Sequence, residues 1–323
     1  MKKNIAILAG GNSGEHQISL NSASLILEHI DPKKFAPYLV VINGSNWICR
    51  TPDGDYPLNI SDFTVKTGGD NLRFDAVFNI IHGTPGEDGM IQGYFDMLGI
   101  PYTSSGRLTS ALTFNKYMCS RFVSSAGCVS TADAVLIRKG AEVNPDDILA
   151  VTGLPCFVKP NNGGSSVGMT KVKVAEKLQA AIRKAMKHDT EVLVEAFVKG
   201  TEVTCGVFSD RGKMVVLPLT EIVSKREYFD FTAKYKGKSE EITPARIPGE
   251  AETDIKRISS ILYRHLGCRG VVRFDYILTP EGPYFLEVNT IPGMSRESII
   301  PQMLAHHGMA LKDFITAMIK NVL

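Results

Sequence analysis

Chemically capable side chains gather between residues 271 and 289, where two apolar runs flank the turn Thr-Pro-Glu-Gly. The turn and the Val, Ile, Phe and Tyr residues around it are typical of a β-hairpin. If Asp275 lies opposite Glu287, and Arg273 opposite Asn289, strand alternation places all four polar side chains on one face. Two carboxylates and an amide oxygen suit Mg²⁺, which takes one or two carboxylates together with substrate phosphates. The hairpin predicts a metal site if the chain also binds phosphates.

The same register assigns the apolar side chains to the other face of the hairpin. That set comprises Phe274, Tyr276, Leu286 and Val288. The neighbouring register would separate the polar groups, and a solvated outer face of an ordinary antiparallel hairpin is the alternative interpretation.

A glycine-rich stretch supplies a candidate phosphate site. Lys159 ends a buried strand expected at residues 155–158, and residues 163–168 form a loop of Gly and Ser before another strand at 169–172. Backbone N–H groups of such a loop can surround phosphate oxygens, with the lysine as a fixed counter-charge. It is not a Walker loop, because there the lysine follows the glycines and begins a helix. A plain hairpin tip is the alternative.

Two glutamates, Glu195 and Glu202, bracket a short connection between two further strands. Extended, unpaired backbone at such a joint can bind an adenine edge, and an acid just beyond it can accept hydrogen bonds from ribose hydroxyls. Exposed strand-end glutamates would explain the pattern equally well. Residues 221–250 are charged, aromatic and without clean periodicity, which predicts a functional lid.

The first third of the chain predicts a parallel open sheet. Strands are expected at residues 4–9, 38–42 and 76–81, with a helix over 18–30 and an irregular stretch from 43 to 70. In such sheets ligands bind at the carboxyl ends of the strands, where both glycine-containing turns fall.

The first of these turns, residues 10–14, has the wrong glycine spacing for a dinucleotide fingerprint, so an NAD-dependent enzyme is not predicted. The following helix opens on Glu15, whose carboxylate favours a cationic ligand group. Simple complementation of the helix dipole is the alternative. His82, after the third strand, has a similar alternative as an ordinary loop residue.

Composition places the chain among globular proteins with a large core. Of 323 residues, 44% are hydrophobic and 22% charged, and 36 basic against 34 acidic side chains give a net charge of +2. No nucleic-acid or membrane partner is predicted, because the charges are interspersed and no apolar run approaches about 20 residues. The six cysteines have no paired spacing, and the N-terminal apolar run is too short for a signal peptide, so a cytoplasmic location is predicted.

The remaining periodicity predicts further elements. Helices are expected over residues 110–126, 175–187 and 252–266 and from 311 onward, and a strand over 129–137.

Six motifs, in this order over nearly the whole chain, resemble the D-alanine–D-alanine ligase family of the ATP-grasp fold. They are GGNSGEHQISLNSA, HGTPGEDGMIQGYFDMLGIPYTSSG, VKPNNGGSSVGM, AKY, RFDY and LEVNTIPGM. The resemblance implies an α/β (α+β) chain with a Rossmann-like open parallel sheet domain at residues 1–106. A central ATP-grasp subdomain at 107–194 and a C-terminal one at 195–323 would follow, and the protein would be a homodimer.

The resemblance also implies that ATP and two Mg²⁺ (or Mn²⁺) ions bind together. Lys116 and Lys159 would hold ATP phosphates beneath the loop residues Gly164 and Ser166. Lys234 would reach the transferred phosphoryl group. Adenosine would be held by Glu195, Ala196, Phe197, Val198 and Glu202, and the metal ions by Asp275, Glu287 and Asn289.

Two D-alanine molecules are the implied substrates. ATP would phosphorylate the first, the amine of the second would attack, and phosphate would leave while a lid excludes water. Glu15 would take the first ammonium group and be tied through Ser165 to Tyr235. Ser298 would hold the second carboxylate, and Arg273 would stabilise the oxyanion. The implied catalytic set is Glu15, Ser165, Arg273, Ser298, Tyr235 and His82.

Some positions depart from the family pattern. Residues 161–163 (Asn-Asn-Gly) lack the charged pair found in some relatives, and Ala196 stands where a lysine is frequent. Glu297 beside Ser298 leaves the second-substrate subsite open. Tyr235 favours an amine as the nucleophile, because relatives that use a hydroxy acid carry a different residue there.

The predicted function is ATP-dependent ligation of two D-alanine molecules for peptidoglycan precursor synthesis. D-serine or D-lactate as second substrate, or another ATP-grasp carboxylate–amine ligase, are alternatives with the same chemistry. A nucleotide-binding regulator without activity is the alternative from another class. The joint presence of the carboxylate pair, the phosphate lysines and the lid tyrosine argues against it.

Overall fold

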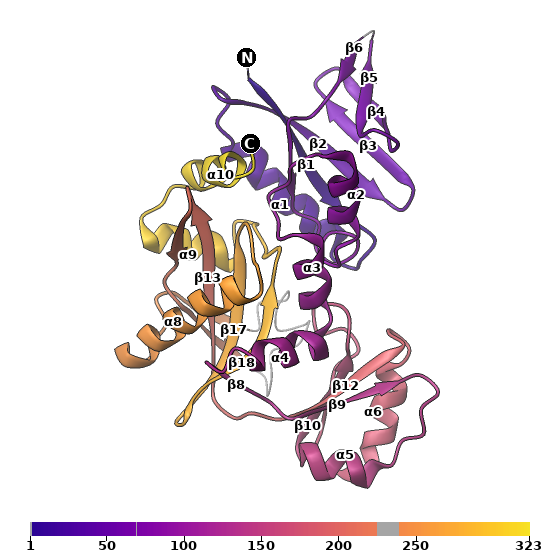
Figure 1. The fold of residues 1–323 in the computed structure, drawn as a ribbon, viewed down its shortest axis with the longest axis vertical. Coiled ribbons are helices and arrows are strands. Elements are labelled where there is room, and N and C mark those ends of the chain that lie inside the picture. Colours follow the sequence, from indigo (N-terminus) through magenta and orange to yellow (C-terminus); the bar gives the residue numbers. More distant parts are fainter. Residues whose placement is uncertain (1, 69, 225–238) are drawn as a thin grey trace.

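Three β-sheets organise the chain in the computed structural model, which describes residues 2–68, 70–224 and 239–323 (Figure 1). In the first sheet, β1 (Lys3–Gly10) lies between β2 (Phe35–Asn43) and β7 (Ala76–Asn79) and runs parallel to both. Residues 5–9 are fully buried, as expected of a parallel strand covered on both faces. Helix α1 (His16–His29) covers one face and α2 (Met90–Leu98) the other. The predicted parallel sheet is confirmed.

The predicted irregular stretch from 43 to 70 is wrong, because this segment extends the same sheet as antiparallel strands. Two-residue turns begin the meander: Gly44-Ser45, with Gly44 at φ 58°, and Pro52-Asp53, followed by Gly54 at φ 141° as the first residue of the next strand. Glycine at the first position of a two-residue turn is a strong hairpin signal, and it outweighs the polar composition. The added strands are β3 (Asn46–Thr51), β4 (Gly54–Asn59), β5 (Thr64–Thr67) and β6 (Asp70–Leu72).

The single helix predicted over 110–126 is two helices, α3 (Arg107–Phe114) and α4 (Lys116–Ser124). Asn115 between them is extended, and its side-chain oxygen accepts a hydrogen bond from the N–H of Met118 at 3.0 Å. This N-cap starts a new helix. The break makes Lys116 the first residue of α4, where its own N–H donates to the carbonyl of Asn161 at 3.0 Å.

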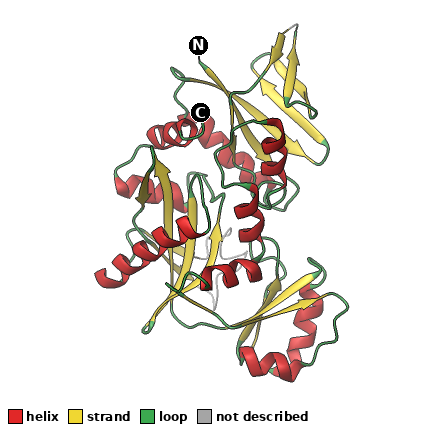
Figure 2. Cartoon of the chain, in the orientation of Figure 1, coloured by secondary structure: helices red, strands yellow, loops and turns green. Residues whose placement is uncertain are grey.

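A second, antiparallel sheet has the strand order β11-β10-β12-β9. Helices α5 (Pro145–Thr152) and α6 (Leu178–Ala185) pack on one of its faces (Figure 2). The predicted strand over 129–137 is divided, since β8 (Ser130–Thr131) joins the third sheet and β9 belongs here. The strands are β9 (Ala134–Arg138), β10 (Cys156–Pro160), β11 (Thr170–Val172) and β12 (Glu191–Ala196).

The third sheet carries the hairpin and has the order β16-β15-β13-β17-β18-β8, with β14 paired to β13. Helix α8 (Gly249–His265) packs on one face through a core that includes Phe274 and Tyr276. The strands are β13 (Thr201–Asp210), β14 (Lys213–Val216), β15 (Thr220–Ser224), β16 (Ser239–Ile242), β17 (Val272–Thr279) and β18 (Gly282–Asn289).

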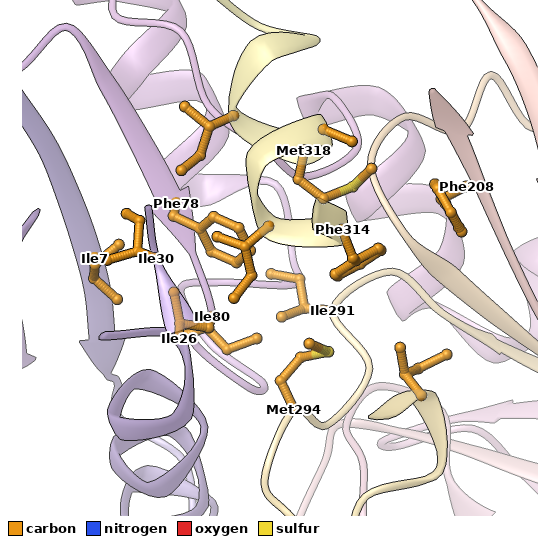
Figure 3. Packing of buried hydrophobic residues seen from close by; sticks show 14 of the residues in the cluster. Ile7, Ile26, Ile30, Phe78, Ile80, Phe208, Ile291, Met294, Phe314 and Met318 are labelled. Carbon is orange, nitrogen blue, oxygen red and sulfur yellow. The ribbon is translucent and has the colours of Figure 1, made fainter. Parts of the chain in front are cut away.

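One hydrophobic core joins the two ends of the chain. Helices α9 (Ile299–His307) and α10 (Leu311–Lys320) pack with α1, β1 and β7, so Phe314 and Met318 share a cluster with Ile26 and Phe78 (Figure 3). The second sheet has its own separate core. The first sheet and the C-terminal helices therefore share one hydrophobic core. The predicted division at residues 106 and 194 stays a prediction.

Residues 225–238, which carry Lys234 and Tyr235 of the predicted lid, lie outside the described residues. Among the described helices, none is both long and apolar enough to cross a membrane.

Candidate active site

A cavity of about 930 Å³ lies where the glycine-containing turn after β1, the second sheet and the third sheet meet. On β10 and β12 the side chains alternate, so Phe157, Lys159 and Glu195 face the cavity while Cys156 and Val158 enter the core beneath α6. The third sheet contributes the polar face of the hairpin. A volume of this size accommodates a nucleotide together with small substrates.

The cavity gathers most of the predicted site residues. Its lining includes Glu15, Lys116, Lys159, Gly164, Ser165, Ser166, Glu195, Ala196, Phe197, Val198, Glu202, Arg273, Asp275 and Glu287. His82, Asn289 and Ser298 do not line it, although Asn289 is bonded to Asp275.

The hairpin register is the predicted one at its polar end. Asp275 pairs with Glu287, and Arg273 with Asn289. The predicted position of Leu286 is wrong, because a β-bulge after Asp275 makes Phe285 the partner of Tyr276.

The bulge changes which side chains enter the core. Phe285 is 5% exposed and its ring meets that of Tyr276 edge to face at 6.3 Å, whereas Leu286 is half-buried and lines the cavity. The extra residue in β18 therefore supplies an apolar wall to the site without moving the two carboxylates out of register.

Asp275 is the centre of a buried hydrogen-bond network. Arg273 donates from Nε to Oδ1 at 2.8 Å and from Nη2 to Oδ2 at 2.7 Å. Thr204 donates to Oδ1 at 2.5 Å, and the side-chain amide of Asn289 donates to Oδ2 at 3.2 Å. Burial acts to lower the pKa of the Arg273 guanidinium, but the nearby acids, Asp275 first and then Glu287, together hold that pKa above its ordinary value. Arg273 is therefore a permanent cation here.

The donor set on this face fits a hard divalent cation. Asp275, Glu287 and the amide oxygen of Asn289 are the ligand types that Mg²⁺ prefers, and one or two carboxylates suffice when phosphates complete the shell. Within the described ranges no cluster of three His, Cys, Asp or Glu side chains suits a metal. A carboxylate offers about four acceptor sites, and four donors fill those of Asp275, so a cation must replace at least one of them.

Two lysines lie opposite this face. Lys159 is 9% exposed, and its ammonium group donates to Glu195 at 2.7 Å. Lys116 donates to the carbonyl of Gly163, which ties α4 to the glycine-rich loop. Burial lowers the pKa of Lys116, Glu287 acts in the opposite direction, and Lys159 lowers the pKa further. Two close cations from different elements form a suitable cradle for phosphate oxygens.

Because the pKa of Lys116 is lowered, we expect the enzyme to lose its ability to bind ATP at a lower pH than an exposed lysine would cause. Only the protonated amine attracts phosphate, so kcat/KM for ATP should fall as the pH rises through a pKa below that of an exposed lysine. Replacement Lys116→Arg should shift this limb to higher pH, because a guanidinium stays charged. A Lys213→Arg exchange at an exposed position on β14 is the control, and an alkaline limb unchanged in Lys116→Arg would contradict the assignment.

The glycine-rich loop meets the turn after β1. The hydroxyl of Ser165 donates to Oε1 of Glu15 at 2.5 Å, and a Cβ at Gly164 would lie 3.2 Å from Oε2. Ser165 and Ser166 both have φ of 55°, a left-handed conformation that costs energy for residues with a Cβ. The loop therefore has an uncommon backbone conformation, which brings the hydroxyl of Ser165 to the carboxylate of Glu15.

His82 and Ser298 lie beside the cavity. His82 is 5% exposed, with Nδ1 bonded to the carbonyl of Ile291 at 2.9 Å and Nε2 3.4 Å from the hydroxyl of Ser22. Ser298 shares hydrogen bonds with the N–H and hydroxyl of Ser295, both at 2.9 Å. The catalytic roles predicted for these two residues stay predictions.

Sequence reasoning missed several residues of the site. Thr204 alternates with Glu202 on β13, which was a usable signal once that strand was placed. Lys171 on β11 does not line the cavity, but its ammonium group lies 3.6 Å from the centre of the Phe197 ring, which does. Phe157 meets Phe197 edge to face at 5.9 Å, which gives the cavity an aromatic wall.

The three-sheet architecture, with two lysines and a glycine-rich loop facing a carboxylate pair, is that of the ATP-grasp enzymes. Family models described as "D-ala D-ala ligase N-terminus" and "D-ala D-ala ligase C-terminus" match residues 4–105 and 122–320. The chain belongs to the D-alanine–D-alanine ligase family.

Individual relatives match over almost their full length. The D-alanine–D-alanine ligase of Phocaeicola vulgatus is 46% identical, with 99% of both chains covered, and that of Parabacteroides distasonis is 47% identical, covering 100% of this chain and 98% of the relative. Among solved structures, the VanG D-Ala:D-Ser ligase from Enterococcus faecalis has a TM-score of 0.89 at 36% identity, with 99% of both chains covered. The D-alanyl-alanine synthetase A of Vibrio cholerae has the same TM-score at 29% identity, covering 99% of this chain and 98% of that one.

Proposed function

We propose that this enzyme joins two D-alanine molecules to D-alanyl-D-alanine, consumes ATP and releases ADP and phosphate, for peptidoglycan precursor synthesis. One observation carries the proposal. The Glu15–Ser165 pair, suited to an amino-acid ammonium group, lies in the same cavity as the phosphate-binding lysines and the carboxylate face of the hairpin.

ATP binds between the second and third sheets. The adenine lies against the aromatic wall near Phe197, with Glu202 at the ribose, and Lys116 and Lys159 hold the phosphates. Lys159 then exchanges part of its contact with Glu195 for phosphate oxygens. Positioning and charge compensation are the main requirements of phosphoryl transfer, because donor and acceptor are both anions.

The first D-alanine presents its carboxylate to the γ-phosphate while Glu15 binds its ammonium group. An oxygen of that carboxylate attacks the γ-phosphorus, and the bond between this phosphorus and the β–γ bridging oxygen breaks. ADP is the leaving group, and the first D-alanine is now an acyl phosphate. The amine of the second D-alanine attacks the acyl carbon, and phosphate departs with the former carboxylate oxygen while the amine loses a proton. Arg273 stabilises the negative charge on the carbonyl oxygen between these events.

The second D-alanine lies toward Ser298 and the loop after β18. The hydroxyl of Ser298 and nearby N–H groups bind its carboxylate. His82 is buried beside this loop, and its bond to the carbonyl of Ile291 holds the loop in place. The roles expected for Lys234 at the transferred phosphoryl group and for Tyr235 near Ser165 fall on residues outside the described ranges.

Asp275, Glu287 and Asn289 would hold Mg²⁺, or Mn²⁺ in its place. Two such ions would supply positive charge that offsets the repulsion between the phosphates and the carboxylate. Arg273, bonded to Asp275 through Nε and Nη2, would keep the guanidinium beside the carbonyl oxygen of the substrate.

D-serine is the second candidate for the amine substrate, because a D-Ala:D-Ser ligase shares the fold at a TM-score of 0.89. Phosphate release with ATP and D-alanine alone, with mass spectrometry of the product, separates the two. D-alanyl-D-alanine should form without any other amino acid. If phosphate is released only after D-serine is added, D-serine and not D-alanine is the second substrate.

The protein acts in the cytoplasm as a homodimer. Its six free cysteines, five of them buried, support a reducing compartment. Light scattering on the purified chain tests the dimer, and a monomer at micromolar concentration would reject it.

A further inference from the structure

We infer that Thr204 is a positioning residue for the metal ligand Asp275, holding this carboxylate in place while Arg273 and the cation exchange as its partners. The inference rests on the proposed function, since it concerns the carboxylate assigned there to Mg²⁺. Nothing in that assignment requires Thr204.

The position of Thr204 relative to Asp275 supports this role. It lies on β13 directly opposite Asp275 on β17, and its hydroxyl donates to Oδ1 at 2.5 Å. Thr204 is 1% exposed and Asp275 5% exposed, so water cannot easily replace this hydrogen bond. A hydroxyl bonded to an ionised carboxylate in such surroundings is a strong, charge-assisted donor.

The four donors to Asp275 differ in how firmly they are held. Arg273 is a long side chain on the same strand, and its guanidinium is the group that the substrate needs. Asn289 donates at the longest of the four distances, 3.2 Å, and its amide oxygen is needed by the cation. The hydroxyl of Thr204 is one bond from a Cβ whose rotation is restricted by β-branching.

A cation that binds Asp275 therefore competes with Arg273 and Asn289, whereas Thr204 remains. Oriented donors to a ligating carboxylate keep it in the geometry that the metal requires, and their removal commonly weakens metal binding about 10- to 100-fold.

The neighbouring strand offers a matched control. Thr220 on β15 is the register partner of Thr204 and is fully buried, but its hydroxyl bonds to that of Thr243 at 2.6 Å. A Thr220→Val exchange removes a buried threonine hydroxyl one strand away from the site without touching Asp275.

The test measures Mn²⁺ binding by electron paramagnetic resonance in the presence of saturating ADP, for the wild type and for Thr204→Val, Thr204→Ala, Thr204→Ser and Thr220→Val. Val keeps the shape and Ala avoids any clash, so at least one variant without the hydroxyl should fold, as checked by thermal unfolding. Both should bind Mn²⁺ about 10- to 100-fold more weakly. Ser should restore most of the affinity, and Thr220→Val should match the wild type. Steady-state assays should show a raised requirement for Mg²⁺, with kcat largely recovered at high Mg²⁺.

Wild-type Mn²⁺ affinity in Thr204→Val or Thr204→Ala would overturn the inference and leave the proposed function intact. An equal loss in Thr220→Val would overturn it as well, because the effect would then be structural. A wild-type protein that binds no Mn²⁺ with ADP would overturn the metal assignment of the proposed function, and with it the inference.

Discussion

Replacing Glu287 by Gln should abolish ligation while leaving a folded protein. Gln has the size of Glu but lacks its negative charge, so one of the two carboxylates on the hairpin face no longer compensates a cation. Removing a partner that only orients a metal ligand costs up to roughly 100-fold in metal affinity or activity. Glu287 is assigned as a direct ligand, so we expect kcat to fall by more than this factor. Dipeptide formation measured by mass spectrometry gives the effect.

The same hairpin provides a control for Glu287→Gln. Glu281 lies exposed in the turn and accepts a hydrogen bond from Thr279 at 2.8 Å. Glu281→Gln should retain wild-type kcat and an unchanged unfolding midpoint. An active Glu287→Gln enzyme would show that the face of β17 and β18 does not bind the metal.

Replacing Arg273 by Lys should have a comparably large effect on rate. The guanidinium makes two parallel bonds to Asp275, and a lysine ammonium group keeps the charge but cannot reproduce the fork. Removing one donor from a developing oxyanion typically costs about 100- to 1,000-fold in kcat, which is the decrease we expect. KM for ATP should change less, because the phosphates are held by Lys116 and Lys159.

Stability separates the two roles of Arg273. Replacement by Met leaves Asp275, 5% exposed, without its cationic partner, and breaking such a buried pair typically costs about 3–5 kcal/mol of the free energy of unfolding. Arg273→Lys should therefore be slow but stable, and Arg273→Met slow and destabilised in urea unfolding. Arg269→Lys, at an exposed position whose guanidinium contacts Tyr102, is the control for both. An Arg273→Lys enzyme with wild-type kcat would remove Arg273 from the oxyanion role.

The sequence was sufficient where local chemistry dominates. Strand alternation placed Asp275 and Glu287 on one face for one of two possible registers, and the structure has that register. The order of lysine, glycine loop and strand singled out Lys159 and residues 163–168, several of which line the cavity. The polar composition of the segment after β2 predicts an irregular stretch, but tight turns at Gly44-Ser45 and Pro52-Asp53 organise it as strands.

Other features depend on contacts that no local pattern encodes. The bulge in β18 moves Leu286 from the core to the cavity, although simple alternation assigns it to the core. The break at Asn115 occurs where the N–H of Lys116 bonds to the carbonyl of Asn161, directly after β10 of the second sheet. Thr204 shares a face of β13 with Glu202, but its bond to Asp275 depends on the register between β13 and β17. Cross-strand and inter-sheet partners are set by the tertiary structure, so single-sequence reasoning could not assign them.

The fate of the carboxylate oxygens tests the central claim, that D-alanine is activated by phosphorylation of its carboxylate. D-alanine labelled with ¹⁸O in both carboxylate oxygens is incubated with ATP, Mg²⁺ and the protein, and the released phosphate is analysed by mass spectrometry. One ¹⁸O atom should appear in each phosphate, because the bond between the acyl carbon and that oxygen breaks when the second amine attacks. Phosphate without ¹⁸O would mean that water, and not D-alanine, receives the phosphoryl group, and would contradict the proposed reaction.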